Sequence, residues 1–237
     1  MPHPPRLTAA IIDLDGTMVD TLGDFEVALN RTLADLDLPG VSRALVARTV
    51  GKGSEHLILT VLQQQLALPD VGACAGRSAE TLYEAAWQRY QHHYLAINGQ
   101  YADVYPGVIE GLQHMQEAGW RLACLTNKPV AFARTLLASK GLDSFFGPIF
   151  GGDSFERKKP DPLPLLKTCE ALGTRPAQTL MVGDSSNDAQ AARAAGCPVI
   201  LLRYGYNHGQ PVDAVSAQGH LDDLTQWRAW HQARLAP

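Results

Sequence analysis

Two aspartates stand two residues apart in the motif Asp13-Leu14-Asp15-Gly16-Thr17, directly after an apolar run. In extended backbone, residues i and i+2 point to the same side, so both carboxylates can face one cavity. Their mutual repulsion raises the proton affinity of one of them unless a cation neutralises the pair. The motif therefore predicts a metal site or a shared proton, although an Asp-Gly pair can also simply close a turn.

Three further polar motifs follow apolar segments. Residues 126–129 (TNKP) open a predicted helix, where hydroxyl, amide and backbone N–H groups can bind a phosphate. The prolines of residues 158–162 (KKPDP) can hold a lysine in a set direction. The acids of residues 183–188 (GDSSND) suit an oxygen-seeking cation such as magnesium. Taken singly, each motif can also be a helix cap or a solvated loop.

The elements that must position these motifs alternate between strand and helix. Short apolar runs typical of buried strands lie at 7–14, 121–125, 179–182 and 198–202, and helical patterns lie at 108–118, 130–140, 163–172 and 187–195. This alternation predicts an α/β fold, a doubly wound parallel sheet flanked by helices. Each polar motif then follows the carboxyl end of a strand or begins a helix.

About a hundred residues separate the first two predicted strands, which is far more than a crossover connection needs. Their apolar spacing is helical throughout, as in Phe25, Leu29 and Leu33. We expect residues 19–103 to form a helical cap domain inserted in a core made of residues 1–18 and 104–237. Ligands of open α/β sheets bind beyond the carboxyl ends of the strands, so the insertion would lie over the site as a lid.

The composition excludes several classes of function. The 237 residues carry 20 Lys+Arg against 24 Asp+Glu, a net charge of −4, which argues against a nucleic-acid partner. No apolar run reaches membrane-spanning length, and the first residues lack the order of a signal peptide, so we expect a soluble, cytoplasmic protein with no membrane partner. The four cysteines are widely spaced and form no CxxC motif, which favours buried free thiols.

The order of the four motifs resembles the haloacid dehalogenase superfamily of aspartate-nucleophile phosphohydrolases. The match extends from Asp13 to Asp188, and the helical insertion resembles that superfamily's first type of cap. Within the superfamily the chain is most similar to phosphoglycolate phosphatases, in the segments DLDGTMVDT, TVGKGSEHL, LTNKP, KKPDP, GDSSND and LRYGYNHGQP. Relatives that act on other small molecules share most of these residues.

The resemblance implies a Mg²⁺-dependent phosphatase that hydrolyses a small phosphorylated metabolite, 2-phosphoglycolate to glycolate, through an aspartyl-phosphate intermediate. Asp13 would be the nucleophile, and Asp15 would protonate the leaving oxygen and then accept a proton from water. Asp13, Asp184 and the main-chain carbonyl of Asp15 would hold the magnesium ion.

The remaining motif residues would support this chemistry. Thr126, Asn127 and Lys159 would bind the transferring phosphoryl oxygens. Asp188 would orient the metal ligands or Lys159, and Thr17 would support the nucleophile loop. For Lys128, exposure to solvent is favoured over contact with the substrate.

Substrate choice should come from the cap, because the core meets only the phosphoryl group. Glycines in residues 48–55 let the backbone approach a ligand, and Arg48 or Lys52 could pair with a substrate carboxylate unless the loop is merely solvated. The stripe of Tyr83, Trp87, Tyr90 and Tyr94 favours packing over a stacking platform.

Other functions remain open at this point. Within the superfamily they are a broad sugar-phosphate phosphatase, a phosphomutase and a pyrophosphatase. Outside enzymes, signalling receivers also place acids, a threonine and a lysine at strand ends, but Asp15 and the long lid favour hydrolysis. The sequence is compatible with a monomer or a homodimer.

Overall fold

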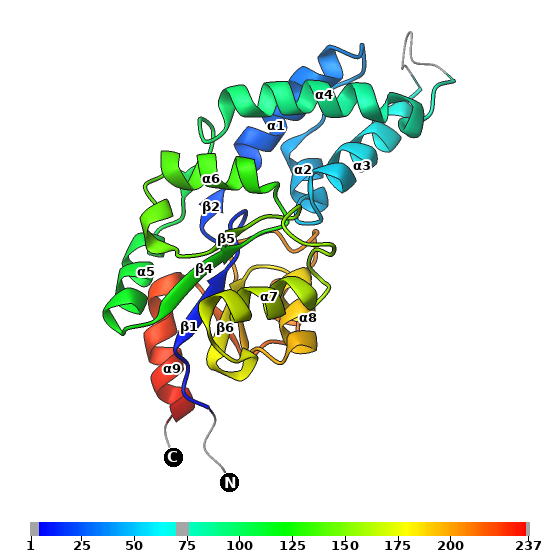
Figure 1. Ribbon diagram of the computed structural model, residues 1–237. Coiled ribbons are helices and arrows are strands. Elements are labelled where there is room, and N and C mark those ends of the chain that lie inside the picture. Colours follow the sequence, from blue (N-terminus) through cyan, green and yellow to red (C-terminus); the bar gives the residue numbers. More distant parts are fainter. Residues whose placement is uncertain (1–4, 70–75, 236–237) are drawn as a thin grey trace.

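The computed structural model describes residues 5–69 and 76–235, which form an α/β core and a helical cap (Figure 1). The core sheet has the strand order β5-β4-β1-β6-β7-β8, and all of its neighbouring strands are parallel. Its strands are β1 (Ala9–Ile12), β4 (Arg121–Leu125), β5 (Ile149–Phe150), β6 (Thr179–Gly183), β7 (Val199–Leu202) and β8 (Gly219–Leu221). The four strands expected from sequence are present, whereas β5 and β8 are too short to give a recognisable apolar run.

Helices cover both faces of the sheet, which confirms the doubly wound architecture (Figure 1). In β1, Ala10 and Ile12 pack on one side, and Ala9 and Ile11 pack on the other. The first side is covered by α5 (Val108–Glu117), α6 (Val130–Ser139) and α9 (Trp227–Leu235), and the second by α7 (Leu163–Leu172) and α8 (Ser186–Ala195). Because both faces are buried, the strand is apolar at every position.

The cap has a hydrophobic core of its own. It consists of α1 (Leu22–Ala34), α2 (Arg43–Thr49), α3 (Ser54–Leu66) and α4 (Ala79–Ile97). Tyr90 and Tyr94 are fully buried there, as the packing interpretation of the aromatic stripe predicts. Phe132 and Tyr206 of the core join the same apolar cluster, so the cap packs directly on the core.

A short antiparallel ribbon connects the two parts of the molecule. In it, β2 (Val19–Asp20) pairs with β3 (Asp103–Val104), so the first and last residues of the expected helical insertion are strand rather than helix. The buried Asp24 carboxylate accepts hydrogen bonds from the backbone N–H groups of Gly99 at 2.7 Å and Tyr101 at 2.8 Å. These bonds attach the beginning of α1 to the returning chain at the base of the cap.

The cysteines agree with the expectation where the structure describes them. Cys124, Cys169 and Cys197 are buried free thiols, and Cys74 lies outside the described residues. Over 5–69 and 76–235, no helix is both long enough and apolar enough to cross a membrane. Short 3-10 helices lie at Asp143–Phe145, Pro176–Gln178, Val212–Ala214 and Leu224–Gln226.

Candidate active site

The polar motifs converge because their strands are neighbours in the sheet. Ile12, the last residue of β1, lies beside Cys124 of β4 and Val182 of β6. Asp13, Thr126 and Asp184 follow these three strands within two residues, so parallel pairing brings all three to one edge of the sheet.

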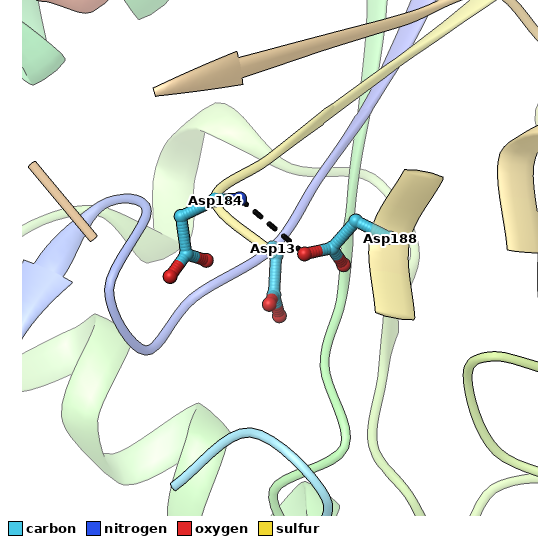
Figure 2. A group of neighbouring side chains, drawn as sticks. All are labelled: Asp13, Asp184 and Asp188. Atoms are coloured by element: carbon cyan, nitrogen blue, oxygen red, sulfur yellow. Dashed lines mark hydrogen bonds between the residues drawn. The ribbon is translucent and has the colours of Figure 1, made fainter. Parts of the chain in front are cut away.

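Three carboxylates lie together at this edge. One oxygen from each of Asp13, Asp184 and Asp188 lies within 4.8 Å of the others (Figure 2). Asp188 comes from the first turn of α8, where one of its oxygens accepts hydrogen bonds from the N–H of Asp184 at 3.3 Å and from the hydroxyl of Ser185 at 2.7 Å. The capping of α8 therefore places the third acid beside the first two.

Burial and mutual repulsion make this cluster costly when all its members are ionised. Burial raises the pKa of Asp13 to about 7, with Lys159 opposing the shift and Asp188 adding to it. The pKa of Asp184 lies well above its usual value because of burial and the negative charges of Asp188 and Asp13. Crowded carboxylate oxygens are the donors that magnesium and calcium prefer, so the cluster fits a divalent cation.

The cluster contains one acid more than the two whose carboxylates were expected to hold the metal. The carboxylate of Asp15 is not part of it, because its Oδ1 forms an ion pair with Lys128 at 2.8 Å. Asp188, which was expected to orient the metal ligands or Lys159, is the third acid of the cluster. The expected contribution of Asp15 was its main-chain carbonyl, and the ion pair with Lys128 involves only its side chain.

Lys159 is the fixed cation of the site. Its ammonium lies 3.0 Å from Oδ1 of Asp13 and donates to Asp188 at 2.7 Å and to the carbonyl of Leu125 at 3.0 Å. Burial lowers the pKa of Lys159, but the charges of Asp13 and Asp188 outweigh that effect and the net shift is upward. The lysine therefore keeps its charge next to Asp13.

Asp184 is oriented by two hydrogen bonds. The hydroxyl of Thr17 donates to its Oδ1 at 2.7 Å, and the backbone N–H of Tyr206 donates to its Oδ2 at 2.6 Å. Gly16 makes this approach possible, because it has φ +83° and a Cβ there would lie 2.4 Å from Oδ2 of Asp184. We expected Thr17 to support the nucleophile loop, and its hydroxyl orients Asp184, which follows β6.

Thr126 and Asn127 lie in the same wall. The hydroxyl oxygen of Thr126 accepts a hydrogen bond from the N–H of Lys128 at 3.2 Å and can still donate its own proton. The side-chain amide of Asn127 bonds both to the backbone N–H and to the carbonyl of Lys159, at 3.0 and 2.8 Å, and donates to the carbonyl of Gly51 in the cap at 3.0 Å. Asn127, which follows β4, thus connects the end of that strand to the loop of Lys159 and to the cap.

The solvent exposure expected for Lys128 is wrong. Its side chain is 1% exposed, and besides the ion pair with Asp15 its ammonium lies 4.4 Å from the ring centre of Phe25 and 4.8 Å from that of Tyr94. Both rings belong to the cap. A sequence pattern cannot show this, because the cap covers the lysine only after the two domains pack together.

The cap candidates Arg48 and Lys52 are exposed. Lys52 lines an open surface hollow with His56, Lys158 and His208, and the side chain of Arg48 lies against Gly209. A separate cavity contains the nucleophile candidate, and Lys52 and Arg48 are not in its wall. It is lined by Asp13, Asp15, Phe25, Val50, Gly51, Gly53, Ser54, Leu57, Thr126, Asn127 and Lys128.

Tyr206 has a role that the sequence analysis did not assign. Its hydroxyl donates to the carboxylate of Asp20 and accepts hydrogen bonds from the N–H of Thr21 at 2.9 Å and from the hydroxyl of Tyr105 at 3.3 Å. Its backbone meanwhile holds Asp184. The only available signal was its place in the segment LRYGYNHGQP, because the contacts join residues far apart in the chain.

Comparisons with known proteins agree with this geometry. A family model described as haloacid dehalogenase-like hydrolase matches residues 10–202. The chain is 39% identical to a phosphoglycolate phosphatase of Thiobacillus denitrificans, over 94% of this chain and 95% of the relative. It is 42% identical to a plasmid-borne phosphoglycolate phosphatase of Cupriavidus necator, over 97% and 96%. A crystal structure of a predicted phosphoglycolate phosphatase from Haemophilus somnus has 31% identity and a TM-score of 0.87, over 95% of this chain and 98% of that one.

Proposed function

The chain belongs to the haloacid dehalogenase-like hydrolase family, and from this premise we propose that it is a magnesium-dependent phosphatase that hydrolyses 2-phosphoglycolate to glycolate and phosphate. The observation that carries the proposal is the position of Asp13. Its carboxylate lies at a strand end, 3.0 Å from the buried ammonium of Lys159 and inside a cluster of acids that fits a divalent cation.

Asp13, Asp184 and the main-chain carbonyl of Asp15 would hold the magnesium ion, with Asp188 beside them. When bound, the ion would neutralise the carboxylates and the phosphoryl group, so that one anion can approach another. Thr17 and Tyr206 hold Asp184 in place for this purpose.

In the first step, an oxygen of Asp13 forms a bond to phosphorus as the bond from phosphorus to the leaving oxygen breaks. Asp15, which lines the same cavity and enters this step protonated on the oxygen that does not face Lys128, gives that proton to the leaving alkoxide, and glycolate departs. Lys159 stabilises the charge on the transferring oxygens. The hydroxyl of Thr126 and the backbone N–H groups near Asn127 are the further donors, since the side-chain amide of Asn127 is occupied.

In the second step, water attacks the phosphorus of the aspartyl-phosphate. Asp15 accepts the proton of that water, the bond from phosphorus to Asp13 breaks, and inorganic phosphate leaves. Both active carboxylates are then restored to their starting forms. The cap above the cavity limits access of bulk water to the site, because Phe25, Val50 and Leu57 form its apolar wall.

The test is a panel of small phosphate esters assayed with and without magnesium. We expect 2-phosphoglycolate to have the highest kcat/KM, and chelation to remove activity. Asp13→Asn should abolish turnover while leaving the fold intact, as measured by circular dichroism, because the amide is a poor nucleophile of nearly the same shape.

Full activity of the Asp13→Asn variant would refute the nucleophile assignment. Equal activity on unrelated sugar phosphates would leave the phosphatase reaction intact but refute 2-phosphoglycolate as the preferred substrate. A phosphorylated Asp13 that persists in the wild-type protein would favour the signalling receiver over the hydrolase.

A further inference from the structure

Lys128 is the one cationic side chain in the wall of the cavity that contains Asp13 and Asp15, among the described residues. Its position is built into the fold, since the side chain is 1% exposed and lies where the cap packs on the core. A buried ammonium is strongly unfavourable without compensating contacts, so its place in a cavity wall requires an explanation.

The contacts of Lys128 leave part of its binding capacity for a ligand. An ammonium has three N–H donors, and one of them donates to Asp15 at 2.8 Å. The rings of Phe25 and Tyr94 stabilise the charge through their faces, at 4.4 and 4.8 Å from their centres. The remaining donors can therefore bind an anion in the cavity.

The cap contributes a second group that favours an anion. Ser54 is the first residue of α3 and lines the same cavity, and the first N–H groups of a helix lack partners within that helix. The hydroxyl of Tyr90 lies beside the side chain of Ser54, and both residues are buried.

We propose that Lys128 and the N-terminal turn of α3, with Ser54, bind the carboxylate of the substrate at the end remote from the phosphoryl group. This inference rests on the proposed function and assigns its specificity to residues other than Arg48 and Lys52, which do not line this cavity. Phe25 and Leu57 line the same cavity, and the ring centre of Phe25 lies 4.4 Å from the ammonium, so the space beside Lys128 favours a short chain.

The experiment compares two substrates that differ only at this end. They are 2-phosphoglycolate and 2-hydroxyethyl phosphate, in which a neutral hydroxymethyl group replaces the carboxylate. We expect Lys128→Gln to lower kcat/KM for 2-phosphoglycolate by at least about tenfold and for 2-hydroxyethyl phosphate by less than about threefold. Ser54→Ala should lower the value for 2-phosphoglycolate by about threefold and the value for the neutral ester by less.

The choice of glutamine separates two roles of the lysine. Its amide can still donate to Asp15, so the variant removes the charge while keeping a partner for that carboxylate. Lys167→Met is the matched control, because this lysine lies on α7 with a side chain 51% exposed, away from the cavity. If Lys128→Gln fails to fold, the comparison of substrates in Ser54→Ala still tests the subsite.

Three results would overturn the inference. Equal losses on both substrates in Lys128→Gln would show that the lysine serves only Asp15. If Lys128→Gln weakened competitive inhibition by inorganic phosphate as much as it lowered kcat/KM for 2-phosphoglycolate, the lysine would be assigned to the phosphoryl group. Loss of discrimination in Lys52→Met or Arg48→Met, but not in Lys128→Gln, would place the subsite elsewhere.

The proposed function fails in a distinguishable way. If the wild-type protein hydrolyses neither ester in the presence of magnesium, the phosphatase proposal is wrong. If it hydrolyses both with equal kcat/KM, the carboxylate subsite and the preference for 2-phosphoglycolate are wrong, but the phosphatase activity stands.

Discussion

Thr17 offers a way to weaken the metal site without removing a carboxylate. Its hydroxyl donates to Oδ1 of Asp184 at 2.7 Å, and the residue is fully buried. Thr17→Val removes this donor and keeps nearly the same shape. The variant should therefore disturb the orientation of Asp184 and its readiness to bind a cation, with little effect on the rest of the core.

The size of the effect follows from two independent considerations. A hydrogen bond to a charged acceptor contributes about 1.5–3 kcal/mol. Loss of a partner that orients a metal ligand weakens metal binding by about 10–100-fold, which corresponds to about 1.4–2.7 kcal/mol. The N–H of Tyr206 still holds the other oxygen of Asp184, so we expect the lower end of the range, a rise of about tenfold in the Kd for magnesium.

The assay is a magnesium titration followed in two ways, by phosphatase activity and by the metal-dependent rise in Tm. At saturating magnesium, kcat should be close to that of the wild type, because Asp13 and Lys159 are unchanged. Thr168→Val is the matched control, since Thr168 is equally buried and its hydroxyl donates to the carbonyl of Pro164 at 2.7 Å, within α7.

A magnesium affinity of Thr17→Val within about twofold of Thr168→Val would refute the reasoning. So would equal losses of Tm in the two variants with identical responses to magnesium. Either result would mean that the hydroxyl of Thr17 supports the fold but not the metal ligand.

Three further predictions concern the same edge of the sheet. Asp15→Asn should stop turnover of alkyl phosphates yet permit phosphorylation of Asp13 by aryl phosphates, whose leaving groups need no proton; unchanged activity on alkyl esters would contradict this. Without metal, the pKa of Asp13 is raised to about 7, so the stability contributed by its protonated form is complete below the pKa of the unfolded state and is lost as the pH rises through about 7. Added magnesium should therefore raise Tm more at about pH 8 than at about pH 6. Equal rises at the two pH values would count against the metal site. Gly16→Ala should lower both Tm and magnesium affinity, because a Cβ would lie 2.4 Å from Asp184 in backbone with φ +83°, and normal magnesium binding would exclude this close contact.

Local patterns were sufficient to predict the frame of the molecule. The apolar runs that end at Asp13, Thr126 and Asp184 are strands of one parallel sheet, and local signals place α5, α6, α7 and α8 within about two residues of their observed ends, whereas α9 was not predicted. Parallel pairing then implied that the polar motifs meet at one edge. The prediction succeeded because strand burial and strand ends leave a direct record in neighbouring residues.

The side chains around the cavity could not be predicted in the same way. Lys128 has the surroundings of a surface loop in sequence, yet Phe25 and Tyr94 cover it. Asn127 has the type and place of a phosphate ligand, yet its amide is bonded to Lys159 and Gly51. In both cases the partner is distant in the chain, and no local pattern encodes which distant residue it will be.

The amino-acid sequence by itself thus determined the four central strands of the sheet, the acids and lysine beyond them, and the presence of a helical insertion, because burial imposes a periodicity that short segments carry. The tertiary structure alone decided that Asp188 joins the carboxylate cluster, that Tyr206 links Asp184 to the base of the cap, and that Lys128 faces the cavity. Asp188 is placed by the packing of α8 against the sheet, and Lys128 by the packing of the cap on the core; both packings are set by surfaces assembled from several elements at once.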